Sequence, residues 1–424
     1  MKTLATVVTV SCAVCARLLA GEPANTLPLP PNPAKDRPAF TAWQTQLRQQ
    51  LSGMLGIPRQ RVPLAPDARG EVEHDGVVIE KWVFTSEPGS RVPAVLYRPK
   101  NAPGPMPAIV FTYGHGGSKG SWSYNYAAQL YAKLGVATLA MDPIGEAERN
   151  IKGATGTRAH DVKGVSERCD AAGRLIMGKF VFDTMRCVDF LMARKDIAHD
   201  RIGVAGNSLG GATGGWVAAL ETRLRMAVVT GWAYDDVTIP TKLCTRWPNE
   251  RMRKLCSWAD YAALSAPHCA LFIGNGDADV IIDQAGTGVA WSGTRAVAAE
   301  AAKTYAALGA PGGIEAWFEP GGGHRPYFAY PVALEWIHKH LGMPGWTLEK
   351  IRALPKLNAG EWCDRHAIPL EKLYGTPLHW RGAILPDLGL HPTPREKLAC
   401  LRPDEIGQPE FTLEGWLEQI SKRP

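Results

Sequence analysis

The chain has 424 residues, of which 45% are hydrophobic and 21% are charged. It is long enough to bury one large core or two modest ones, and this composition excludes a mainly disordered chain. The 47 basic and 41 acidic side chains give a net charge of +6 and are scattered along the whole sequence. Because no element gathers the lysines and arginines, we expect a mildly basic soluble surface and no nucleic-acid partner.

The N-terminal segment has the pattern of an export signal. Lys2 supplies a positive charge, Leu4–Val14 is a short apolar run, and Ala20 offers a small residue for cleavage. The run is shorter than the roughly 20 apolar residues that span a bilayer, and no later stretch is long enough. We therefore predict a signal peptide over residues 1–20 and a periplasmic or secreted protein. A lipoprotein or an uncleaved anchor is the alternative.

The cysteines do not form a metal-binding or redox motif. Two lie in the leader, where Cys12 or Cys15 would be the lipid-attachment site of a lipoprotein. No C-x-x-C pair occurs among the others, so their spacing predicts no zinc site. In an oxidising compartment Cys244 and Cys256 are the nearest pair for a disulfide, with buried free thiols as the alternative. The cysteines after the leader are Cys169, Cys187, Cys244, Cys256, Cys269, Cys363 and Cys400.

Residues 21–68 are expected to form a linker and one helix. The Pro-rich stretch 22–37 predicts an extended linker. An amphipathic helix is predicted from apolar residues at three- and four-residue spacing, namely Phe40, Trp43, Leu47, Leu51 and Leu55. Short, antiparallel strands are then expected at Val77–Ile79, Trp82–Phe84 and Val92–Tyr97.

Apolar strands and helices alternate through the centre of the chain. Strands are predicted at Ala108–Phe111, Val136–Ala140, Ile202–Ala205, Met226–Thr230, Ala270–Ile273 and Ile314–Phe318. Helices are predicted at Tyr126–Leu134, Phe180–Arg194, Gly210–Leu220, Thr294–Leu308 and Pro331–Leu341. This alternation is typical of an α/β fold with a mostly parallel sheet flanked by helices. We expect residues 69–345 to form this domain and residues 346–424 to form a C-terminal extension, with a helix at Leu413–Ile420.

The strongest chemical signal is a G-x-S-x-G motif centred on Ser208. It follows one predicted strand and begins a helix of small residues. A tight strand-to-helix turn of this kind exposes the serine hydroxyl at the edge of the sheet. We predict Ser208 as a nucleophile and the backbone N–H of Leu209 as an oxyanion donor. A serine in a purely structural turn is the alternative.

Two aspartates follow the predicted strand Ala270–Ile273, at the position where a hydrolase carries its triad acid. The chain order of such a triad is serine, then acid, then histidine. Asp277 ends a G-x-x-D pattern and is the predicted acid. Asp279 is the alternative, with a loop-capping or solvated role as its simpler interpretation.

His324 is the predicted general base. It lies on a Gly-rich loop between the strand Ile314–Phe318 and the last helix of the domain. His338 and His340 fall inside that helix, where exposure is expected. His268 precedes both aspartates and breaks the chain order.

A second Gly-rich loop follows the strand Ala108–Phe111. Its residues 112–117 read T-Y-G-H-G-G, which leaves the backbone accessible to a substrate carbonyl. We predict that the backbone N–H groups of His115 and Gly116 complete the oxyanion hole. A simple Gly-rich turn is the alternative.

These motifs together resemble one branch of a known superfamily. The sequences Y-G-H-G-G at 113–117, D-P-I-G-E-A-E-R at 142–149 and G-N-S-L-G-G at 206–211 are similar to those of dienelactone hydrolases and acetyl xylan esterases, within the α/β hydrolases. Ala147 replaces a glycine of the family pattern. The resemblance implies an exported serine esterase that cleaves carboxylic esters through an acyl-enzyme, with no metal or organic cofactor.

The resemblance also suggests a substrate class. Exported esterases of this kind often deacetylate polysaccharides, so an acetyl xylan-type ester is the leading expectation, with a small-molecule ester also possible. Indole rings suit the faces of sugars, and they suit a protein core equally well. The 14 tryptophans include Trp122, Trp216, Trp232, Trp247, Trp258 and Trp291. A prolyl-oligopeptidase-like peptidase acting on small peptides and a catalytically inactive binding module are the alternatives. The sequence indicates no particular oligomeric state.

Overall fold

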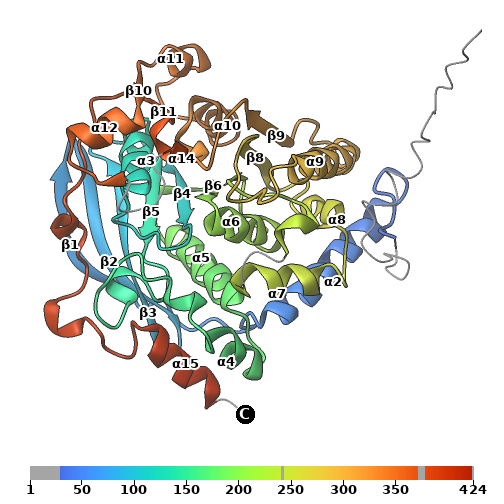
Figure 1. Ribbon diagram of the computed structural model, residues 1–424, viewed down its shortest axis with the longest axis horizontal. Coiled ribbons are helices and arrows are strands. Elements are labelled where there is room, and N and C mark those ends of the chain that lie inside the picture. The colour runs from blue at the N-terminus through green and yellow to red at the C-terminus, as the bar shows by residue number, and fades with distance from the viewer. Residues whose placement is uncertain (1–28, 240–242, 371–377, 423–424) are drawn as a thin grey trace, which may run out of the picture.

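A nine-stranded sheet forms the centre of the molecule, in the order β1-β2-β3-β5-β4-β6-β7-β8-β9 (Figure 1). The computed structural model describes residues 29–239, 243–370 and 378–422. The strands are β1 (Asp67–His74), β2 (Val77–Glu87), β3 (Ser90–Pro99), β4 (Met106–Thr112), β5 (Ala137–Met141), β6 (Ile197–Asn207), β7 (Met226–Thr230), β8 (Ala270–Gly276) and β9 (Ile314–Glu319). β1 to β3 and the β3–β5 pair are antiparallel, and all pairs from β5 to β9 are parallel. This confirms the predicted α/β fold.

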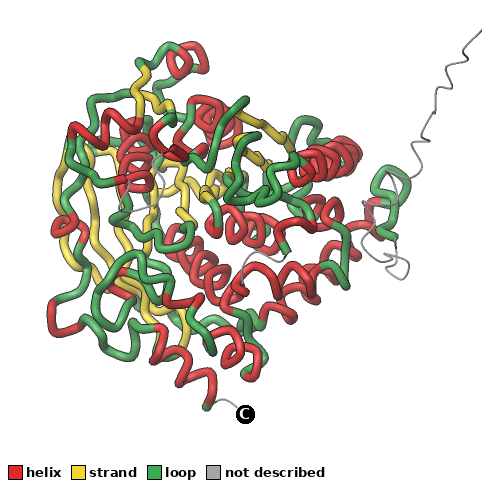
Figure 2. The backbone as a smooth tube through the Cα atoms, viewed as in Figure 1, coloured by secondary structure: helices red, strands yellow, loops and turns green. Residues whose placement is uncertain are grey.

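The parallel strands are apolar because helices cover both faces of the sheet. Every residue of β4, β5 and β7 is buried. α3 and α10 contact the strands from one side, whereas α5 and α6 pack on the other side (Figures 1 and 2). The long helices are α2 (Arg37–Leu55), α3 (Trp122–Lys133), α5 (Ile176–Met192), α6 (Leu209–Leu220), α7 (Leu243–Met252), α9 (Val289–Ala307) and α10 (Pro331–Leu341). The shorter ones are α4 (Val165–Ala171), α8 (Trp258–Ala263), α11 (Leu348–Arg352), α12 (Ala359–Arg365), α14 (Leu378–Arg381) and α15 (Leu413–Ser421).

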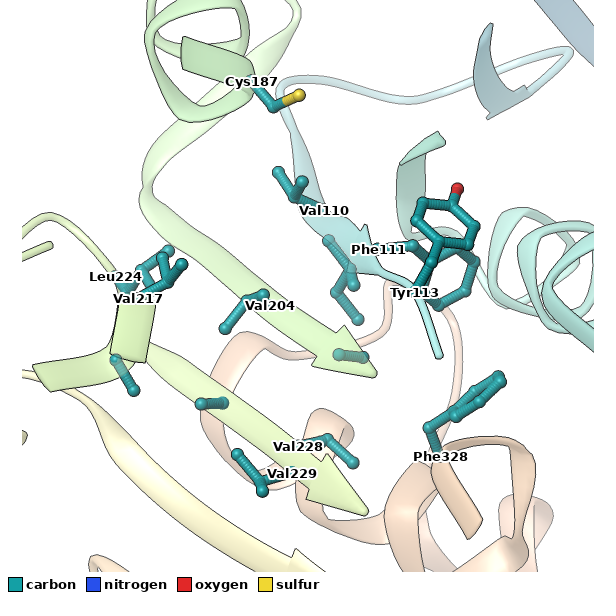
Figure 3. Packing of buried hydrophobic residues seen from close by; sticks show 14 of the residues in the cluster. Val110, Phe111, Tyr113, Cys187, Val204, Val217, Leu224, Val228, Val229 and Phe328 are labelled. Atoms are coloured by element: carbon teal, nitrogen blue, oxygen red, sulfur yellow. The ribbon is translucent and has the colours of Figure 1, made fainter. Parts of the chain in front are cut away.

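The core fills the space between these layers with interlocking apolar side chains (Figure 3). Val110, Val204 and Val228 lie on the neighbouring strands β4, β6 and β7, and all three are fully buried. Cys187 comes from α5, and Phe328 comes from the turn after β9. The same packing fixes the carboxyl ends of the strands, where the predicted site residues lie.

The C-terminal residues cover part of the domain. A small antiparallel pair, β10 (Lys356–Asn358) with β11 (Ile384–Pro386), is followed by a segment that ends in α15 beside α4. The carboxylate of Glu148 accepts hydrogen bonds from the backbone N–H groups of Cys400 (2.9 Å) and Leu401 (2.7 Å). The ring of Trp416 lies under the cations of Arg174 and Lys179, at 5.5 and 5.6 Å. Charged groups of the domain therefore hold this segment in place.

Export and disulfide bonding were also predicted. The leader lies outside the described residues, and no helix among those described is long and apolar enough to cross a membrane. The seven described cysteines are all buried free thiols. Cys244 and Cys256 are therefore not joined, and the alternative of buried thiols is the one that the structure has.

Glu87 is the centre of a buried ionic cluster at the end of β2. Its carboxylate contacts Arg174 at 2.9 Å and Lys179 at 3.1 Å, and it is 1% exposed. Burial alone raises the pKa of Glu87, but the charges of Lys179 and Arg174 outweigh burial and hold the pKa at about 2. Because the folded pKa lies below the unfolded value, the stabilisation is present above about pH 4.3 and is lost as the pH falls through 2.

We expect Glu87→Gln to lower the free energy of unfolding by about 3–5 kcal/mol at pH 7, because Arg174 and Lys179 lose a buried carboxylate partner, although Lys179 keeps Asp183 at 2.8 Å. Urea denaturation at pH 7 and at pH 3 measures the free energy of unfolding of both proteins. The difference between the wild type and Glu87→Gln should be smaller at pH 3. Glu300→Gln is the control, since Glu300 is 59% exposed and pairs with the exposed Lys303. It should change stability by less than about 0.5 kcal/mol. Equal effects of the two substitutions would contradict the prediction.

Candidate active site

Ser208 lies in a strained turn between β6 and α6. Its backbone angles are φ 62° and ψ −125°, in a region that residues other than glycine rarely adopt. A Cβ atom added at Gly206 or at Gly210 would collide with Thr112 of β4. Glycine is therefore required on both sides of the serine, because the turn is pressed against the neighbouring strand. The side chain of Ser208 is half-buried and lines the main pocket of this face.

His324 is held against a carboxylate in the same pocket. Its Nδ1 lies 2.7 Å from Oδ2 of Asp279, and both side chains are buried. Oδ1 of Asp279 accepts hydrogen bonds from the backbone N–H groups of Ile281 (2.9 Å) and Ile282 (3.3 Å). The carboxylate is thus fixed by its own loop, and it orients the imidazole so that Nε2 points away from it.

The structure places Asp279, and not Asp277, against His324. Asp277 was the predicted acid, but it is exposed, and its Oδ1 accepts a hydrogen bond from the N–H of Gly321 at 2.7 Å. The chain turns immediately after β8, and the N–H of Asp279 donates to Gly276 at 3.3 Å. This turn sends Asp277 outward and brings Asp279 inward. The prediction that Asp277 contacts His324 was wrong.

Asn207 is a neighbour of the histidine that the sequence did not indicate. Its Nδ2 lies 3.4 Å from Nε2 of His324, while its Oδ1 accepts a hydrogen bond from the hydroxyl of Thr230 at 2.9 Å. Between the described residues Ser208 and His324 there is no direct hydrogen bond, although both line one pocket. Asn207 directly precedes Ser208 in the G-x-S-x-G motif, and this position was the only feature of the sequence that placed Asn207 near the site.

The predicted oxyanion donors lie on two sides of the serine. Leu209 is the first residue of α6, whose N-terminal N–H groups carry partial positive charge. The Gly-rich loop after β4 passes so close that a Cβ atom on Gly114 would lie 3.4 Å from Cβ of Ser208. His115 and Gly116 follow in this loop and line the pocket. The backbone of both segments can therefore approach an oxygen bound at Ser208.

The pocket is an open cavity of about 1740 Å³, including the solvent at its mouth. Two buried tryptophans, Trp122 and Trp380, form part of its wall, with their ring centres 5.8 Å apart. The Trp380 ring also stands edge-on to His324 at 6.2 Å. Of the tryptophans named from the sequence, only Trp122 lines this pocket in the described part of the chain. Trp216, Trp232, Trp258 and Trp291 are buried in the core, and Trp247 packs against it.

The C-terminal segment completes this wall. Ile368, Trp380, Thr393 and Arg395 all line the pocket, although they follow the central domain in the sequence. Patterns of strands and helices carry no information about such a contribution, because it depends on how the extension folds back. The segment therefore has a direct part in shaping the site.

The D-P-I-G-E-A-E-R segment supports the site without lining its centre. Asp142 and Glu148 both contact the ammonium group of Lys119, which is 4% exposed. Burial alone lowers the pKa of Lys119, but the two carboxylates outweigh burial and raise it. Lys119 belongs to the Gly-rich loop region, and Arg149 pairs with Asp183 of α5 at 2.7 Å. The Lys119 pairs join the loops after β4 and β5, and the Arg149–Asp183 pair joins the segment after β5 to α5.

Comparison with known sequences agrees with these motifs. Residues 65–234 match the family model described as acetyl xylan esterase. YtaP of Bacillus subtilis, which has been proposed to be a hydrolase, is 27% identical over 196 residues. The match covers 44% of this chain and 63% of YtaP, so the chain spans less than two thirds of that relative.

Solved structures show the same fold. Methylesterase BT1017 has a TM-score of 0.57 at 17% identity, over 87% of this chain and 75% of its own. A Bacteroides fragilis protein, proposed to be an acetyl xylan esterase, has a TM-score of 0.55 at 20% identity, over 72% and 81% of the two chains. The fold is that of the α/β hydrolases, and the predicted resemblance to acetyl xylan esterases is confirmed.

Proposed function

We propose that the chain is a serine esterase in which Ser208 attacks a carboxylic ester, His324 is the base and Asp279 orients the imidazole. His324 Nε2 removes the hydroxyl proton as the serine oxygen bonds to the carbonyl carbon. The negative charge on the carbonyl oxygen is stabilised by the N–H of Leu209 and by an N–H of His115 or Gly116. The imidazolium then protonates the leaving alcohol, and water hydrolyses the acyl-enzyme with the same base.

The observation that carries this proposal is the convergence of three distant segments in one pocket. A serine in a strained turn, a histidine hydrogen-bonded to a buried aspartate and a Gly-rich backbone loop all reach the same edge of the sheet. This set has the serine–acid–histidine chain order of the α/β hydrolases. A fluorophosphonate probe tests the proposal, because only an activated serine reacts with it. Labelling at Ser208 is expected, and a folded chain that stays unlabelled would instead favour a binding module.

We place the substrate among carbohydrate esters, with an acetyl group on a xylan-type chain as the first candidate. The matching family model is that of acetyl xylan esterase. The tryptophans Trp122 and Trp380 line the pocket, and indole rings suit the apolar faces of sugars. The pocket is also open and wide enough for a substrate larger than a simple ester. Such a substrate fits the export that the N-terminal residues predict, to the periplasm or the medium.

A panel of substrates checks this class. We expect acetate release from acetylated xylo-oligosaccharides at a kcat/KM above that for a simple aryl acetate, because the additional sugar contacts stabilise the transition state. Trp122→Ala should lower kcat/KM for the acetylated xylo-oligosaccharides and leave kcat/KM for the aryl acetate nearly unchanged. Hydrolysis of small peptide amides at a rate equal to that of the esters would favour the peptidase alternative.

A further inference from the structure

A cluster of metal-ligand side chains lies beside the pocket, and none of these side chains belongs to the proposed triad. His115, His160, Asp161 and Cys244 each offer one ligand atom, and these atoms all lie within 4.8 Å of one another. They come from the loop after β4, from the short turn Ala159–Asp161 and from the start of α7. The sequence could not show this grouping, because its members are up to 129 residues apart.

The spacing within the cluster suits a tetrahedral ion. Nε2 of His115 lies 3.1 Å from Sγ of Cys244 and 3.3 Å from Oδ2 of Asp161. Nε2 of His160 lies 3.9 Å from Oδ1 of Asp161. A tetrahedral zinc ion with bonds of about 2.0–2.3 Å separates its ligand atoms by about 3.3–3.8 Å. Small side-chain movements would therefore be enough to enclose an ion.

His160 supplies a second, independent observation. It is 2% exposed, and neither of its ring nitrogens has a hydrogen-bond partner within the described part of the chain. A buried imidazole whose nitrogens form no hydrogen bond is costly, because the ring has lost its contacts with water. Its ring packs face to face with His115 at 5.3 Å and edge-on to Phe180 at 5.1 Å. An ion bound through one ring nitrogen would satisfy that nitrogen.

We propose that His115, His160, Asp161 and Cys244 bind one zinc ion that holds the Gly-rich loop in place. Two imidazoles, a thiolate and a carboxylate form a closed set of four protein ligands, which is typical of a structural zinc site. On binding, the thiol of Cys244 releases its proton to solvent, so the thiolate and the carboxylate balance the charge of the ion. Oδ2 of Asp161 accepts a hydrogen bond from Arg158 at 2.6 Å, and Oδ1, which lies 3.9 Å from Nε2 of His160, is the oxygen that would bind the metal.

The position of the site suggests its effect. His115 directly precedes Gly116, whose N–H is a proposed oxyanion donor. An ion on the His115 side chain would join this loop to the segments that carry His160 and Cys244. The zinc ion would take no part in the attack on the ester, so this proposal is independent of the esterase activity.

Metal analysis of the purified full-length chain tests the proposal. We expect about one zinc ion per chain. After the metal is removed, the chain should bind Co²⁺ and show an absorption band from thiolate-to-cobalt charge transfer. Cys244→Ser should abolish that band and weaken Zn²⁺ binding by at least about tenfold, since changes outside the ligand set already cost about 10–100-fold. Cys256→Ser is the control, because this buried thiol lies outside the cluster, and it should keep both properties.

Two results would overturn the proposal. One is a wild-type chain that binds neither metal in stoichiometric amount or that shows no thiolate band with Co²⁺. The other is unchanged Zn²⁺ affinity in Cys244→Ser and in Asp161→Asn. The wild-type cobalt spectrum decides the matter even where a variant fails to fold, and Asp161→Asn preserves the shape of a partly exposed side chain.

Discussion

Replacing Ser208 with alanine is expected to reduce kcat/KM for ester hydrolysis by about 10⁴–10⁶-fold, because the nucleophile is lost while the oxyanion donors remain. The remaining rate should still exceed the uncatalysed rate, since the backbone N–H groups still polarise the carbonyl. Steady-state kinetics on an aryl acetate, with fluorophosphonate labelling of the same samples, measures both effects.

Two further substitutions make this result interpretable. Ser208→Gly should be equally inactive but no less stable in thermal unfolding, because glycine adopts φ 62° without strain. Ser292→Ala removes an exposed hydroxyl on α9 and should leave the activity unchanged. Activity of Ser208→Ala within about a hundredfold of the wild-type rate would rule out Ser208 as the nucleophile.

The parallel part of the sheet was predictable because burial on both faces demands continuous apolar runs. β7 and α10 begin and end where the sequence predicts them, at Met226–Thr230 and Pro331–Leu341. The predicted strands Val77–Ile79 and Trp82–Phe84 are one strand, β2, because Glu80 and Lys81 continue the ladder. β1 was missed because most of its residues are polar and none of them is buried.

Site residues were predictable where a tight local turn requires particular residue types. They were less predictable where their position depends on how distant segments pack. Gly206 and Gly210 are required by the approach of β4, so the motif identified Ser208. Nothing in the order of the residues after β8 shows where the chain turns, so Asp277 and Asp279 could not be separated. The tryptophan of the C-terminal segment, Trp380, could not be assigned to the pocket either, because its place depends on the fold of the extension.

The histidines show the same limit in physical terms. His340 was expected to be exposed on the last helix, but its ring packs against Trp336 at 4.3 Å. Burial lowers the pKa of His340 to about 4, so this ring stays neutral at pH 7. Trp336 lies one turn earlier on the same helix, and the sequence alone does not show that the histidine ring packs onto it. The metal-ligand cluster was hidden for a related reason, since its members meet only after three segments fold together.

The two aspartates after β8 offer the sharpest test of the proposed triad. Asp279→Asn is expected to lower kcat by about 10⁴-fold, because asparagine cannot accept the Nδ1 proton of His324 with a charged oxygen and would favour the wrong tautomer. Asp277→Asn should keep kcat within about tenfold, because an amide oxygen can still accept the Gly321 N–H. The two substitutions remove the same charge only two positions apart, so each is the matched control of the other.

Kinetics on an ester substrate, with thermal unfolding to confirm that both variants fold, separates the two roles. The larger loss should appear in kcat, because the imidazolium that Asp279 stabilises forms only as the ester reacts. If Asp277→Asn were the inactive variant and Asp279→Asn the active one, the buried carboxylate at His324 would be structural. The catalytic histidine would then need a different partner, and the loop after β8 would have to rearrange before reaction.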